Sequence, residues 1–279
     1  MSQVYTAKKS DKFHLFRIFE KYLEIFKISY RSTFAYILDA LSNTINYAIR
    51  LLIFNQLYIA TYSSLSVETI DGLKRSEVIW MLMFVQSFHL SLRLLIDIIN
   101  DIKSGQISVF LNKPFYFPLF QLSEFLGQQG VKCFINIIFG SIITYFLVGG
   151  FNFQITSLLL AIPLMIGTII LAFVQVFTFA LISFWIEDSS AIFRIYSKLD
   201  MVLGGSIFPP SLFPGILKNI SLLLPFANGS FVVGRCIVAF QKDEYTKALI
   251  LQLLWITFFT SLIGILYKKG VKKLVIQGG

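Results

Sequence analysis

The sequence predicts an all-α integral membrane protein with six transmembrane helices. Apolar residue types make up 56% of its 279 residues, against roughly 45–50% in soluble domains. Charged residues make up only 14%, too few to cover the surface of a soluble fold, where about 25% is usual. The apolar residues also gather in runs close to the roughly 20 helical residues that a bilayer core of about 30 Å requires. These observations exclude a disordered chain and make lipid the expected solvent.

Residues 1–33 form a cytosolic interface segment ahead of the transmembrane domain at 34–279. Seven basic and three acidic side chains lie in this segment. Its apolar residues recur three and four positions apart, which describes one face of a helix; they are Phe16, Phe19, Leu23, Phe26 and Tyr30. We expect an amphipathic helix that lies on the membrane surface, with its lysines against anionic lipid headgroups. A helix packed on a partner protein is the alternative.

Six apolar segments are candidate transmembrane spans. They are residues 36–59, 76–98, 125–148, 155–186, 190–208 and 247–267. The fourth is the most uniformly apolar, whereas the first contains Asp39 and Arg50 among several amides. Because polar groups are costly against lipid, the first helix should turn that side toward protein or a water-filled path.

Positive charge assigns the orientation of the six spans. If the N-terminus is cytosolic, the inner segments hold fifteen Lys and Arg residues and the outer segments hold six. Cytosolic loops of membrane proteins carry the excess of positive charge. We therefore expect both termini in the cytosol, and the net charge of +9 indicates membrane orientation rather than binding to nucleic acid.

The connection between the second and third spans predicts a short cytosolic helix. Ile107, Phe110 and Leu111 would share one side of it, and Pro114 would end it. Such a helix is suited to contact with a cytosolic partner. The connection between the fifth and sixth spans is apolar but is too often broken to cross the bilayer, so we expect a re-entrant or interfacial hairpin on the outer side; the breaking residues are Pro209, Pro210, Pro214, Gly215 and Pro225.

The order of several short motifs resembles a known family. These are Tyr30 to Tyr36 with Asp39, Ile102 to Leu111 with Pro114, Phe184 to Asp188, Phe208 to Phe226, and the tail from Lys268 to Gly270 with Gln277 to Gly279. Together they resemble the membrane subunits of ABC-2-type exporters (the type V exporter plan), in the small six-helix branch whose ATPase is a separate chain.

The resemblance implies a bacterial cell-membrane exporter built from two membrane chains, identical or related, over two nucleotide-binding subunits. ATP and Mg would then bind the partner ATPase, and this chain would hold no cofactor. In agreement, no glycine is followed by lysine, so the phosphate-binding Gly-x-x-x-x-Gly-Lys-Ser/Thr motif is absent. The residues that the resemblance assigns to ATPase coupling are Asp101, Ile102, Lys103, Ser104, Gly105, Ile107, Phe110, Leu111 and Pro114, with Glu187 and Asp188 as a helix junction or second contact.

Four ionisable residues are candidates for the translocation path: Arg50, His89, Arg93 and Asp200. Intramembrane charges are expensive and are by default functional candidates. For Arg93, which lies four residues before Asp97, the alternative is an ion pair or a side chain that reaches the headgroups. Asp200 could pair with Arg50, or lie closer to the membrane surface than its span suggests. No metal site is expected from two cysteines and two histidines.

Two other functions compete with the exporter interpretation. An ion-coupled secondary transporter usually shows internal repeats with broken helices, and no repeat relates 36–148 to 155–267. An integral membrane enzyme that modifies lipids requires a convergent set of acids, histidines or a nucleophile, for which two histidines and no Gly-x-Ser-x-Gly motif offer little.

Overall fold

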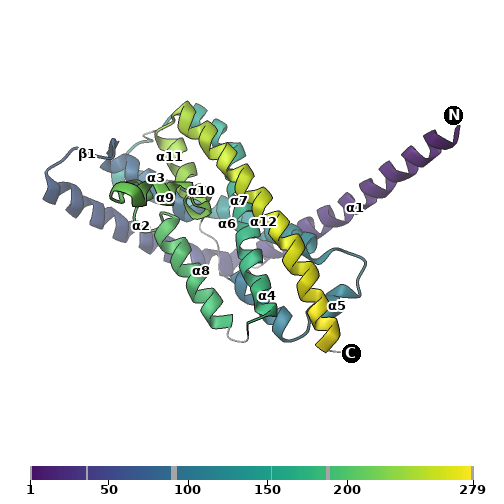
Figure 1. The fold of residues 1–279 in the computed structure, drawn as a ribbon. Coiled ribbons are helices and arrows are strands. Elements are labelled where there is room, and N and C mark those ends of the chain that lie inside the picture. Colours follow the sequence, from purple (N-terminus) through teal and green to yellow (C-terminus); the bar gives the residue numbers. More distant parts are fainter. Residues whose placement is uncertain (1, 36, 89–92, 152, 187–188, 278–279) are drawn as a thin grey trace.

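The computed structural model describes residues 2–35, 37–88, 93–151, 153–186 and 189–277, and these segments are almost entirely helical (Figure 1). The helices before the third span are α1 (Ser2–Ala35), α2 (Ile37–Leu65), α3 (Arg75–Phe88), α4 (Arg93–Lys103) and α5 (Ile107–Leu111). The later helices are α6 (Phe117–Val148), α7 (Ile155–Leu181), α8 (Ser189–Leu203), α9 (Gly215–Leu223), α10 (Pro225–Gly229), α11 (Phe231–Val238) and α12 (Lys242–Gln277). Short 3-10 turns lie at Ile182–Phe184 (η1) and Pro210–Leu212 (η2). A small antiparallel hairpin, β1 (Thr69–Ile70) with β2 (Leu73–Lys74), joins α2 to α3.

Three helices of the described chain are long and apolar enough to cross a membrane. They are Phe117–Val148, Ile155–Phe184 and Lys242–Leu274, and they correspond to the expected third, fourth and sixth spans. Large apolar side chains on these helices remain exposed, including Phe134, Phe146, Leu159, Leu253 and Leu254. Exposure of so many large apolar groups is typical of helices that face lipid or another chain. The membrane character predicted from composition is therefore supported by the fold.

The expected first, second and fifth spans are built differently, and six crossings remain a prediction. The first corresponds to α2, which continues six residues beyond the expected end at residue 59. Within the second, the structure describes α3, which ends at Phe88, and α4, which begins at Arg93 and continues beyond the expected end to Lys103; residues 89–92 lie outside the described residues. The fifth corresponds to α8, which ends at Leu203 because Gly205 follows with a φ of +77°, a conformation that favours glycine.

Helix α3 is buried at the centre of the part of the molecule that contains α2, α6 and α11. Every side chain from Val78 to Phe88 is buried, and the helix packs against α2, α6 and α11. A helix that is apolar on all sides is expected in the interior of a protein. The indole of Trp80 donates a hydrogen bond of 3.0 Å to the carbonyl of Gly150, which ties α3 to the end of α6.

Helix α1 packs on another helix of the same chain rather than standing alone. Its C-terminal half lies along α6, while the rest extends sideways out of the bundle (Figure 1). Gly127 of α6 makes this close approach possible, since a Cβ at that position would lie 2.6 Å from the backbone oxygen of Phe26. The hydroxyl of Tyr22 also accepts a hydrogen bond of 3.0 Å from the backbone N–H of Tyr116. Protein therefore covers part of the face that the sequence analysis assigned to the membrane surface.

Candidate functional site

The turn between α4 and α5 is a compact element closed by its own backbone. The backbone N–H of Ser104 donates to the carbonyl of Asn100 at 2.8 Å, and the Ser104 hydroxyl donates to the same carbonyl at 2.7 Å. Gly105 adopts a φ of +75°, which reverses the chain between the two helices. The hydroxyl of Ser108 then donates to the carbonyl of Gly105 at 2.7 Å. Asp101, Ile102 and Lys103 end α4, and Pro114 follows α5 as expected.

Helix α5 is anchored through the side that the sequence analysis expected to face a partner. Ile107 is fully buried, together with Ile102, in the core formed by α4, α6, α7 and α12. Phe110 and Leu111 are half-buried and pack against the same core. The exposed side of α5 instead carries Ser108 and Val109, and the Val109 side chain is 57% exposed. Any contact of this element with another protein would therefore involve the exposed Val109 side chain and its polar neighbours rather than the buried Ile107 side chain.

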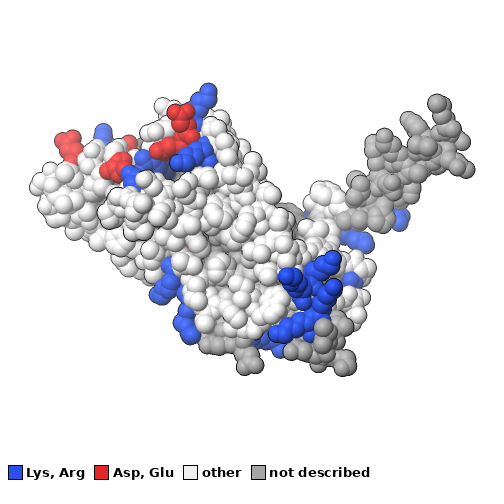
Figure 2. Space-filling view, in the orientation of Figure 1, with Lys and Arg blue, Asp and Glu red and all other residues white. Residues whose placement is uncertain are grey.

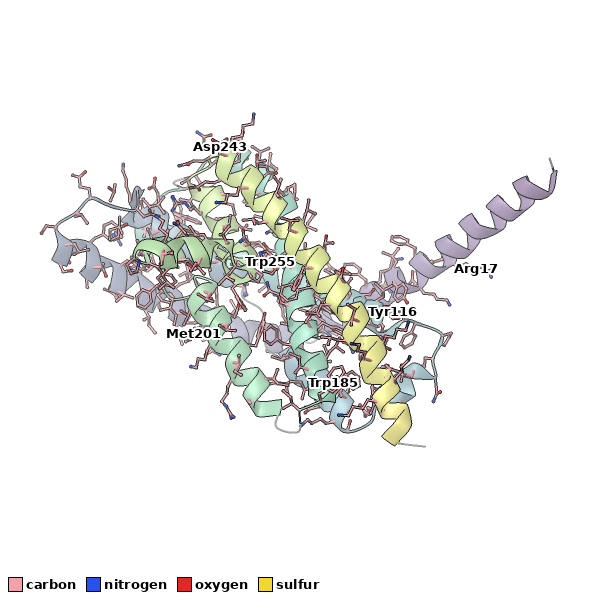
Figure 3. All side chains as sticks on the ribbon, viewed as in Figure 1. Arg17, Tyr116, Trp185, Met201, Asp243 and Trp255 are labelled. Atoms are coloured by element: carbon pink, nitrogen blue, oxygen red, sulfur yellow. The ribbon has the colours of Figure 1, made fainter. Side chains whose placement is uncertain are left out.

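The region after α7 lies close to the C-terminal half of α12. The ammonium group of Lys273 donates a hydrogen bond of 3.0 Å to the carbonyl of Phe184, and Gly270 of α12 leaves room for the Phe184 ring. Glu187 and Asp188, the second expected coupling contact, lie outside the described residues. Figure 3 shows Trp185 at this end of the molecule and Asp243 at the opposite end of α12.

The segment from Gly204 to Val238 is a chain of short helices, and η2, α9 and α10 each begin at or directly after a proline. Pro209 caps η2, which begins at Pro210, and Pro214 caps α9, which begins at Gly215. Pro225 begins α10. These helix starts agree with the chain breaks that the sequence predicted. Helix α10 packs on α7 and α12, and α11 packs on α3. The indole of Trp255 on α12 also donates to the carbonyl of Leu223, at the end of α9, at 2.9 Å (Figure 3).

A buried polar cluster joins this broken segment to α7 and α12. The amide nitrogen of Gln252 lies 2.8 Å from the carbonyl of Asn228 and 3.1 Å from the hydroxyl of Thr168. Thr168 in turn donates a short hydrogen bond to the carbonyl of Gly229. Because helix breaks expose backbone carbonyls, such side-chain partners are required at membrane depth.

Ion pairs hold the β1–β2 hairpin against the same broken segment. Arg235 of α11 pairs with Asp71 and also with Glu244 of α12, the latter at 3.1 Å. Lys218 of α9 lies 3.4 Å from the second carboxylate oxygen of Asp71. Burial alone would raise the pKa of Asp71, but hydrogen bonds from Ser211 and Arg235, with the charges of Arg235 and Lys218, hold it below its usual value. A cavity of about 150 Å³ opens beside these ion pairs.

Of the four path candidates, the structure describes the side chains of only Arg50 and Asp200, and it does not place these two in one cavity. Arg50 is exposed on α2. Asp200 is half-buried on α8 and lines a cavity of about 20 Å³ together with Thr168 and Gln175. Arg50 does not line this cavity. Arg93 begins α4, but its side chain and all of His89 lie outside the described residues. Their role in a path remains a prediction.

A polar stripe on α6 is the feature that the sequence analysis missed. Gln121, Glu124, Gln128 and Lys132 recur three and four residues apart and line a cavity of about 270 Å³ between α4, α5 and α6. This spacing was readable in the sequence. It was overlooked because the third span was expected to begin at residue 125, whereas α6 begins at Phe117.

Comparison with known proteins agrees with this architecture. A family model described as ABC-2 family transporter protein matches residues 44–278, which is most of the chain. A search of curated proteins found no match.

Proposed function

The chain belongs to the ABC-2 transporter family, and from that premise we propose that it is the permease subunit of an ATP-driven exporter. As a member of this family it is a membrane component of transport that associates with ABC ATPase components, and it is not itself catalytic. In the proposed assembly, two such membrane chains, identical or related, form the path and two separate ATPase subunits bind ATP and Mg. The proposed location is the bacterial plasma membrane, with both termini in the cytosol and α1 against the lipid surface.

The distribution of charge supports this orientation. Figure 2 shows a group of Lys and Arg at the end of the molecule where α5 and the C-terminal end of α12 lie, and no Asp or Glu is in view among them. The Asp and Glu residues in this view lie at the opposite end, together with other Lys and Arg. The basic side chains of the last turns of α12 are Lys268, Lys269, Lys272 and Lys273. Positive charge collects on the cytosolic side of membrane proteins. An ATPase in the cytosol would therefore meet the α4–α5 turn.

The single observation that carries the proposal is the anchoring of α5. A lever that transmits movement must be rigidly joined to the body that it moves. Ile107 is buried in the same core as side chains of α4, α7 and α12. Packed cores move as units instead of deforming continuously, so a displacement of α5 would be passed to α4 and then to α7, against which α4 packs.

The proposal is tested by one substitution on the exposed side of α5. Val109→Asp places a charge where a partner would contact the helix and leaves buried Ile107 untouched. The matched control is Val67→Asp, because Val67 is also an exposed valine but lies in the connection between α2 and β1. Pull-down of a soluble ATPase in mild detergent, together with vanadate-sensitive ATP hydrolysis of the complex, gives the readout.

We expect Val109→Asp to weaken ATPase binding at least about 10-fold, which corresponds to the loss of about 1.4 kcal/mol or more of binding free energy. Val67→Asp should leave binding unchanged. If both variants bind the ATPase equally well, α5 is not part of the interface with the ATPase. A purified chain that transports without ATP would instead favour an ion-coupled transporter.

A further inference from the structure

Helices α4 and α6 build a cavity with an acidic wall beside α5. Asp97 and Asp101 lie four residues apart, on one face of α4, and Glu124 lies opposite them on α6. The three carboxylates line one cavity of about 270 Å³. This is an acidic site at the end of the molecule where Lys and Arg dominate the surface (Figure 2).

Aromatic rings also line the cavity. The rings of Phe110 and Phe120 lie 5.6 Å apart between centroids, and both line the cavity. The ammonium group of Lys113 lies 5.1 Å from the centroid of the Phe110 ring. Aromatic faces attract cations through the ring quadrupole. The Lys113 ammonium group makes such a contact with the Phe110 ring.

The charges of the cavity favour a positive ligand. Asp97 and Asp101 are like charges at a helical spacing of four, which is unfavourable. Burial, and then the nearby Asp97 carboxylate, raise the pKa of Asp101. Lys132 also lines the cavity, so the ionisable lining residues carry a formal charge of −2. A bound cation would interact favourably with the carboxylates of Asp101 and Glu124.

A buried amide supplies a second and independent indication. The Gln121 side chain lines the cavity and is only 6% exposed. It forms no hydrogen bond within the part of the chain that the structure describes, whereas the neighbouring Gln128 donates to Glu124 at 3.3 Å. The Gln121 amide is therefore available to a polar group that enters the cavity.

The shape of the cavity indicates an organic ligand. Its α6 wall runs from Phe120 to Lys132, which is about 18 Å of helix at a rise of about 1.5 Å per residue. No group of three or more His, Cys, Asp and Glu within the described residues is placed to hold a metal ion. An elongated site lined by both carboxylates and aromatic rings suits a cation attached to an apolar group.

We propose that the cavity between α4, α5 and α6 binds a small organic cation that carries an aromatic or aliphatic group. The carboxylates of Asp101 and Glu124 hold the charge, Phe110 and Phe120 cover the apolar part, and the Gln121 amide bonds a polar atom of the ligand or its water. That the cavity opens to the cytosol rests on the proposed function, whereas the binding of the cation does not depend on it.

The test is direct binding of benzyltrimethylammonium to the purified full-length chain in detergent, measured by equilibrium dialysis. Benzenesulfonate, an aromatic anion of similar size, is the ligand control. Glu124→Gln and Asp101→Asn remove charge from the cavity with little change in shape. Asp243→Asn is the protein control, because Asp243 is an exposed acid in the first turn of α12, at the opposite end of the molecule.

We expect the chain to bind benzyltrimethylammonium at least 10-fold more tightly than benzenesulfonate. Glu124→Gln and Asp101→Asn should each weaken binding about 5- to 10-fold, Asp243→Asn should not, and 0.5 M NaCl should weaken it further. The comparison of cation with anion uses the unchanged chain, so it stands even if a variant fails to fold.

Equal binding of the two ligands, or binding unchanged by both cavity variants, would overturn the proposal. If free cation does not bind but Asp101→Asn reduces ATPase pull-down, the cavity receives a basic side chain of the ATPase, and the proposal is also overturned. Because the dialysis uses the chain without ATPase, its failure is separate from a failure of the proposed exporter function.

Discussion

Two glycines three residues apart on α6 offer a direct test of how α1 is held. An alanine Cβ at Gly127 would lie 2.6 Å from the carbonyl oxygen of Phe26 and 3.0 Å from the backbone nitrogen of Tyr30. Both atoms belong to the α1 backbone, so no side-chain rotation relieves the contact. At Gly130, also within α6, nothing lies within 4 Å of the added carbon.

The magnitude follows from the difference between the two substitutions. In a helix interior, Gly→Ala is favourable by roughly 0.5–1 kcal/mol, and this term is common to both positions. Overpacking against the α1 backbone costs about 1–3 kcal/mol and applies only at Gly127. Gly127→Ala should therefore be less stable than Gly130→Ala by about 1–3 kcal/mol.

Thermal unfolding of the two variants in the same detergent, combined with limited proteolysis, measures this difference. We expect Gly127→Ala to unfold at a lower temperature and to be cleaved sooner within α1. A Gly127→Ala protein that is as stable as Gly130→Ala, with α1 equally protected, would show that α1 does not pack on α6 at this point.

Three further predictions concern the turn, the polar cluster and the ion pairs. Gly105→Ala should be destabilising by about 1 kcal/mol and should reduce ATPase pull-down, because alanine disfavours a φ of +75°. Gln252→Leu, which leaves the Asn228 carbonyl without this partner, should lower stability by about 1–2 kcal/mol in a thermal unfolding assay. The pKa of Asp71 is held below its usual value in the folded protein. The ionised Asp71 carboxylate therefore stabilises the folded state fully above the unfolded pKa of about 3.9, and this stabilisation is lost as the pH falls through the lower folded pKa. Asp71→Asn should thus flatten the fall in melting temperature between pH 5 and pH 3, and an unchanged pH profile would contradict this.

The long apolar helices were predictable because hydropathy and length alone define them. The run at 155–186 corresponds to α7 with η1, and the run at 247–267 lies within α12. The start of α6 was not found, because Gln121 and Glu124 interrupt the apolar pattern while facing a cavity rather than lipid. Local hydropathy does not distinguish a polar residue that ends a helix from one that lines an internal surface.

The direction in which an amphipathic helix faces was the least predictable property. The pattern at Ile107 and Phe110 correctly indicated a short helix with one apolar side, but an apolar side suits its own core as well as a partner. The same ambiguity applies to α1, where Phe26 packs toward α6. Only the tertiary arrangement resolves such cases. The prolines at 210, 214 and 225 were informative, since proline restricts its position in a helix to the first turn or its cap.

The hydrogen bond between Trp255 and Leu223 gives the molecule an optical reporter of its own. The protein contains three tryptophans, and Trp255 is the one whose indole bridges α12 and the end of α9. Replacing Trp80 and Trp185 by phenylalanine would leave a single emitter at that junction. Its emission wavelength would then follow any separation of the two helices during a turnover cycle, without a chemical label.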